Sequence, residues 1–192
     1  MGSITEDEYR KHMAGIVSEG FTLDPPGYEQ LSLWTHILMH LVNAQKNFEW
    51  ALDHPKVSSN SNNFLQQNAF FISGIMAYGR CYASSGGGIP TLDAKRVYAG
   101  SEDGIAIHQR LIDLRNKIAA HTDESDLVRL TLAVKDEPDH ITIRHIYTNA
   151  IPTDEIPDFL EAVSHTSHFV TVSLNKRLNK LEKNIGKKIS LD

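Results

Sequence analysis

Four side chains with complementary chemistry fall within seven residues of this 192-residue chain: Arg115, Asn116, Lys117 and His121. Arginine keeps its proton at physiological pH, so it can clamp a phosphate or stabilise developing negative charge. Histidine titrates near neutrality and can take up or release a proton. Asparagine can orient a phosphate oxygen or a hydroxyl, and lysine adds attraction. These residue types are suited to cleaving a phosphodiester without a metal ion.

Metal-independent RNA cleavage has three chemical requirements. A proton leaves the 2′-hydroxyl, another is given to the departing 5′-oxygen, and the phosphorane needs a donor that stabilises its charge. His121 suits either proton transfer, Arg115 suits the stabilisation, and Asp123 could hold the imidazole in one tautomer. One chain supplies only one strong acid–base group here, whereas a symmetric dimer would supply two.

Helical geometry separates the two main candidates. Arg115 and His121 are about 120° apart around an ideal helix and roughly 9 Å apart along it. They converge only if the helix ends near Ala120, if the arginine reaches across, or if a second subunit supplies one group. In the structural alternative, His121 packs on the core at the helix end and Arg115 pairs with Asp123 or Glu124.

Recurring apolar residues at three- and four-residue spacing predict a mainly α-helical protein, with helices over 5–19, 28–53, 63–83, 101–121 and 154–184. After residue 126 apolar and polar residues alternate, which predicts a β-hairpin over 127–147. We expect one helical domain over 1–192, with a short helix and turn over 1–27 and a helical core over 28–123 and 154–184. Because two strands alone are marginally stable, the hairpin should lean on the helices or pair with another copy.

The composition is typical of a soluble globular protein, with 41% hydrophobic and 22% charged residues. Apolar stretches stop well short of a membrane span, and the acidic N-terminus lacks the apolar core of a secretory signal. Cys81 is the only cysteine, which excludes an internal disulfide and a Cys-based zinc site. We therefore expect a cytoplasmic protein with no membrane contact. The net charge of −5 argues against a general nucleic-acid coat protein but leaves room for a local basic cleft.

Two pairs of histidines have the spacing of neighbours on a helix, His36 with His40 and His165 with His168. Neither pair has an evident third ligand, so we expect no metal ion and no other cofactor. The end of the last helix is basic. Its simpler interpretation is a solvated face that complements the helix dipole, and its functional interpretation is a surface that attracts phosphate or a partner. The basic residues are Lys176, Arg177, Lys180, Lys183, Lys187 and Lys188.

The segment from Leu114 to Asp123 resembles the motif of the HEPN superfamily, in which four to six residues separate an arginine from a histidine. Here five residues intervene, and the favoured asparagine follows the arginine. The preceding helix carries an aromatic-x-Arg element that ends at Arg80, and His108 lies near the start of the Arg/His helix. These features are similar to those of a subset of HEPN-like proteins, and they make Arg80 and His108 candidates for substrate binding or support of the site.

The resemblance implies an antiparallel helical bundle that forms a homodimer, with Arg115 and His121 at a cleft between the subunits and the hairpin as an insertion. It implies a metal-independent endoribonuclease related to toxins or phage defence, with RNA and an antitoxin or other protein as partners. The alternative is a non-catalytic HEPN-like module that binds RNA, a nucleotide or a protein. A third possibility is a helical interaction protein whose long C-terminal helix is the working surface.

Overall fold

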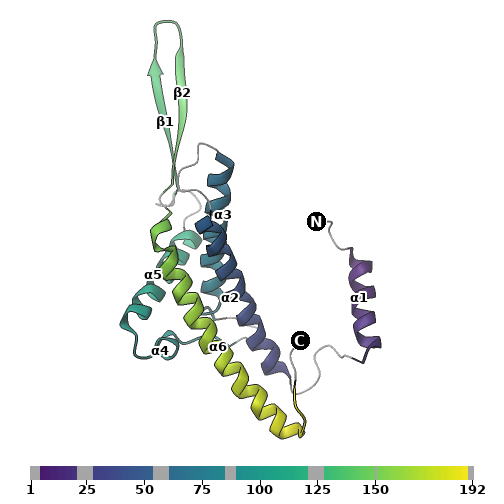
Figure 1. Ribbon diagram of the computed structural model, residues 1–192. Coiled ribbons are helices and arrows are strands. Elements are labelled where there is room, and N and C mark those ends of the chain that lie inside the picture. Colours follow the sequence, from purple (N-terminus) through teal and green to yellow (C-terminus); the bar gives the residue numbers. More distant parts are fainter. Residues whose placement is uncertain are drawn as a thin grey trace.

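Three long helices form the centre of the molecule in the computed structural model, which describes residues 5–20, 28–53, 61–84, 90–120, 128–149 and 151–189. Helices α2, α3 and α6 lie side by side, and α5 packs against α3 and α6 (Figure 1). The predicted mainly helical class with one β-hairpin is confirmed. The elements are α1 (Glu6–Ser18), α2 (Glu29–Asp53), α3 (Ser61–Arg80), α4 (Ala94–Val97), α5 (Glu102–Ala120), β1 (Val128–Asp136), β2 (Ile141–Asn149), the 3-10 turn η1 (Thr153–Glu155) and α6 (Ile156–Ile185).

Aromatic side chains join the three central helices. The ring centroid of Phe48 on α2 lies 6.2 Å from that of Phe71 on α3 and 5.7 Å from that of Phe159 on α6. All three side chains are almost fully buried. Gly74 of α3 makes this approach possible, because a Cβ atom there would lie 2.8 Å from two ring carbons of Phe48. The core thus depends on a small residue facing a large one.

Local sequence signals set several helix ends. Thr5 and Glu8 form a complete capping box at the start of α1, although none of that helix's residues is buried. The Ser101 hydroxyl accepts a hydrogen bond from the Gly104 amide at the start of α5. Gly186 ends α6 in the left-handed conformation at φ 69°. Helix α3 differs from its predicted range of 63–83, since it begins at Ser61 and ends at Arg80.

The hairpin projects away from the helical bundle (Figure 1). Its antiparallel register places Val134 opposite Ile143, which gives the pair one apolar face with Leu132 and Ile141. These four side chains are each 54–63% exposed, so this face does not pack on the described helices. Of the two supports expected for the hairpin, packing on the described helices is not seen for this face, and pairing with another copy remains a prediction.

None of the helices in the described ranges combines the length and the apolar character needed to span a lipid bilayer.

Candidate functional site

Arg115 packs where α5 meets α3. A Cβ atom at Gly79 would lie 2.8 Å from Arg115 Cδ and 3.0 Å from its Cγ, so the arginine stem fills the space above this glycine. Arg115 is partly buried as a result. Among the described residues its guanidinium has one hydrogen bond, a long one of 3.4 Å from Nη1 to Asn116 Oδ1. The packed stem fixes the cation, and most of its N–H donors have no acceptor within the described ranges.

Two of the other motif residues, Asn116 and Lys117, lie within the described part of the chain. Asn116 and Lys117 are exposed in the last turns of α5. The described part of this helix ends at Ala120. His121 and Asp123 lie outside the described residues, as does Glu124, the other predicted partner of Arg115. The described site therefore consists of two cations and an amide at the end of α5.

Basic groups of α2 and α3 lie close to one another near this position. Arg80 is exposed and directly follows the glycine that Arg115 contacts. Burial, and then the nearby charges of Arg80 and His36, lower the pKa of His40 below its ordinary value. Since a phosphate would be attracted to such a cluster, Arg80 is placed where it can contribute to an anion-binding surface.

The side chain of His108, a candidate for substrate binding or support of the site, is buried. It is 8% exposed, and its Nδ1 lies 2.9 Å from the Tyr78 hydroxyl. Its ring also packs against Tyr82, with centroids 4.3 Å apart. Among the described residues, the Tyr78 hydroxyl is its hydrogen-bond partner. His108 thus belongs to the contact between α5 and α3 rather than to an open site.

A chain of buried hydroxyls continues from His108 to α6. The hydroxyls of Tyr78 and Tyr98 are 2.9 Å apart, and the Tyr98 hydroxyl donates to the Ala162 carbonyl oxygen at 3.0 Å. The Ala162 carbonyl oxygen also accepts a hydrogen bond from the Thr166 hydroxyl at 2.9 Å, so two hydroxyls converge on it.

Thr166 of α6 completes the buried network. Its Oγ1 lies 2.9 Å from the hydroxyls of both Tyr82 and Tyr98, and Thr166 is fully buried. Burial raises the pKa of the hydroxyls of Tyr78 and Tyr82 far above their ordinary range, so both remain neutral. The network joins α3, α4, α5 and α6 and fixes the orientation of the helix that carries Arg115.

The burial of His108 predicts a pH-dependent stability. Burial lowers its pKa below the ordinary value of 6.5, so the unfolded chain binds more protons than the folded protein below about pH 6.5. Stability should therefore fall as the pH drops from 6.5 toward the folded pKa, and His40 acts in the same direction. Urea unfolding between about pH 7 and pH 5 should show a smaller loss for His108→Gln than for the wild type.

The matched control is His12→Gln, at an exposed position on α1. It should leave the pH dependence of unfolding unchanged. If His108→Gln loses as much stability on acidification as the wild type and His12→Gln, the buried imidazole is not the source of the effect.

The histidine pairs do not form a metal site in the described part of the chain. No group of three or more His, Cys, Asp or Glu side chains there is placed to bind a metal ion. His165 lies with its Nε2 2.9 Å from the Val97 carbonyl oxygen and stacks on Tyr98 at 5.0 Å. Cys81 is buried, and burial raises its thiol pKa to about 12, which makes it a packing residue.

Two features of the site were not predicted from the sequence. Gly79 was noted only as part of the aromatic-x-Arg element, although it is the residue on which Arg115 packs. The network through Tyr98 and Thr166 was also missed. A polar threonine in the apolar stripe of α6 was the available signal, because a buried hydroxyl needs a hydrogen-bond partner.

Comparisons with protein-family models, with curated proteins and with solved structures found no match for this chain. The resemblance to the HEPN superfamily therefore remains an expectation that rests on the residues of the motif.

Proposed function

We propose that this protein is a HEPN-like, metal-independent endoribonuclease that acts as a homodimer, with a role in a toxin or phage-defence system. Arg115 and His121 are the proposed catalytic pair, and Asn116 assists them. Lys117 and Arg80 attract the substrate backbone. An antitoxin or other protein is the proposed regulatory partner.

The position of Arg115 is the observation that carries this proposal. Its stem is held against Gly79, and no described carboxylate neutralises its guanidinium. A fixed cation whose N–H donors are mostly unpaired among the residues that the structure describes is suited to stabilising charge that develops on a phosphate. Asn116 and Lys117 are exposed beside it on the same helix end. A purely structural arginine would be expected to place its guanidinium against an acid or a carbonyl group.

The proposed reaction is an in-line transesterification. His121 removes the proton of the 2′-hydroxyl, the bond from O2′ to phosphorus forms, and the bond from phosphorus to O5′ breaks. The partner subunit's His121 gives a proton to the leaving O5′. Arg115 stabilises the phosphorane, Asn116 orients a phosphate oxygen, and Asp123 holds the imidazole. The products carry a 2′,3′-cyclic phosphate and a 5′-hydroxyl.

Cleavage of single-stranded RNA in the presence of EDTA tests this function. We expect the purified protein to cut RNA under these conditions and to leave 2′,3′-cyclic phosphate ends, which end-group analysis of the fragments detects. A substrate with 2′-O-methyl sugars should resist cleavage because it lacks the nucleophile. Activity that requires a divalent ion, or that leaves 3′-hydroxyl ends, would contradict the proposed chemistry.

The second candidate is a HEPN-like module that binds RNA, a nucleotide or a protein without turnover. The inward orientation of His108 favours it, because the described residues near Arg115 then offer cations and an amide, and no described histidine of α5 is exposed. Binding of unmodified RNA with no fragments formed after prolonged incubation would establish this candidate in place of the first.

A further inference from the structure

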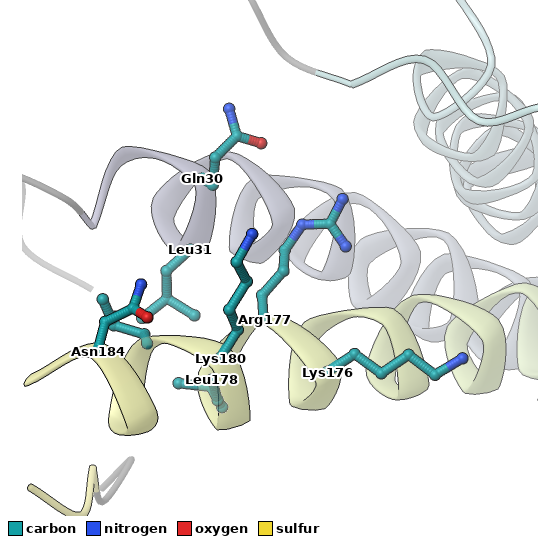
Figure 2. A pocket seen from close by; sticks show the side chains of 8 residues that line it. Gln30, Leu31, Lys176, Arg177, Leu178, Lys180 and Asn184 are labelled. Atoms are coloured by element: carbon teal, nitrogen blue, oxygen red, sulfur yellow. The ribbon is translucent and has the colours of Figure 1, made fainter. Parts of the chain in front are cut away.

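A groove of about 560 Å³ lies between the start of α2 and the end of α6, at the end of the bundle away from the hairpin (Figure 1 and Figure 2). The polar part of its lining is Lys176, Arg177, Lys180, Gln30 and Asn184, with no acidic residue among the described residues that line it. Figure 2 shows Arg177 and Lys180 extending from α6 toward α2. The chemistry of the lining therefore favours an anionic ligand.

Arg177 is held in place before any ligand binds. Its guanidinium carbon lies 4.1 Å from the centre of the Trp34 ring, which is 7% exposed. Its Nη1 donates to the Ser173 carbonyl oxygen at 3.1 Å. Stacking on an indole orients the planar guanidinium without using its N–H groups, so further donors can bind an acceptor. A fixed donor of this kind loses less entropy when it binds a phosphate.

The lysines of α6 extend the positive charge along one edge of the helix. Lys176, Lys180 and Lys183 recur at spacings of four and three residues, so they share a face. All three are exposed, and no described carboxylate forms an ion pair with them. Their charges are therefore available to a ligand in solution.

The acid nearest to these lysines in the sequence, Glu182, is bound by other groups. Glu182 accepts hydrogen bonds from Lys188 Nζ at 3.2 Å and from the Ile189 amide at 3.0 Å. Residues 173–189 contain six basic residues and this one acid, a net charge of +5 in a chain whose net charge is −5. This positive charge exceeds the partial negative charge at the C-terminus of a helix. A local reversal of charge of this kind is typical of a surface that binds polyanions.

We propose that this groove binds the phosphate backbone of single-stranded RNA, as a second contact surface separate from the Arg115 motif. Lys176, Lys180 and Arg177 contact phosphates. Leu178 and Leu181, which are partly buried in the groove wall, offer apolar surface to sugars and bases. The choice of RNA among polyanions rests on the proposed function, whereas the phosphate-binding chemistry of the groove does not.

Binding of a fluorescent single-stranded RNA with 2′-O-methyl sugars tests the inference without cleavage. The double variant Lys176→Gln/Lys180→Gln removes two charges from the groove. Lys11→Gln/Lys95→Gln removes two charges from exposed positions on α1 and α4 and serves as the control. We expect the groove variant to bind about tenfold more weakly at low salt. Its slope of log affinity against log salt should shrink by about 1.4, since each phosphate contact contributes about 0.7.

Equal weakening by both double variants would overturn the inference, because the effect would then be one of net charge alone. Binding of anionic phosphatidylserine vesicles but not of RNA would overturn it in favour of a membrane surface. If the groove variant loses RNA binding but the wild type never cleaves RNA, the groove stands and the proposed function fails. If the wild type cleaves RNA and both double variants bind RNA equally well, the proposed function stands and the groove inference fails.

Discussion

Replacing Arg115 by alanine is expected to slow RNA cleavage by about 10²–10³-fold, the usual cost of removing a preorganised donor that stabilises a transition-state charge. The loss should appear in the single-turnover rate at saturating RNA, because the guanidinium acts on the phosphorane more than on the bound substrate. The fold should survive, since the arginine stem packs on the surface of Gly79 rather than in the core.

The matched control is Arg96→Ala, which removes the same charge from an exposed position on α4. Its cleavage rate and melting temperature should stay close to those of the wild type. Equal rates for Arg115→Ala and Arg96→Ala would remove Arg115 from the proposed site. A fall in the melting temperature of Arg115→Ala large enough to explain the lost activity would make its role structural.

Phe48→Ala is expected to lower the free energy of unfolding by about 3–5 kcal/mol. The ring contacts Phe71 and Phe159 from the two neighbouring helices and covers Gly74, so its removal opens a cavity where α2, α3 and α6 meet. A backbone held on three sides cannot collapse to fill such a space. Urea unfolding followed by circular dichroism measures the loss.

Leu52→Ala on the same helix is the control for this core substitution, since Leu52 is 39% exposed. We expect it to cost well under half as much as Phe48→Ala, and Phe48→Leu should fall between the two. Similar losses for Phe48→Ala and Leu52→Ala would mean that the three helices do not share a packed centre at Phe48.

Most of the helical framework could be predicted from the sequence because periodicity depends on local spacing. Helix α5 was expected over 101–121 and is described over Glu102–Ala120. The change of period after residue 126 likewise predicted both strands. What the apolar face of the hairpin contacts could not be predicted, since alternation shows that a face exists but not what covers it.

The surroundings of the site were harder to predict because they depend on contacts between distant residues. His108 and Arg115 are seven positions apart on α5, and both contact α3. Their spacing could not show that the side chain of His108 enters a buried network whereas that of Arg115 packs on Gly79. Tyr98 directly follows the four-residue helix α4 and reaches Thr166 sixty-eight positions later, which no local pattern indicates.

The most direct test of the central claim is the single-turnover rate of RNA cleavage by His121→Ala in the presence of EDTA. His121 is the proposed acid–base group of each subunit, so its removal should abolish cleavage while RNA binding and the melting temperature stay near those of the wild type. Cleavage by His121→Ala at the wild-type rate would contradict an Arg/His ribonuclease site at the end of α5.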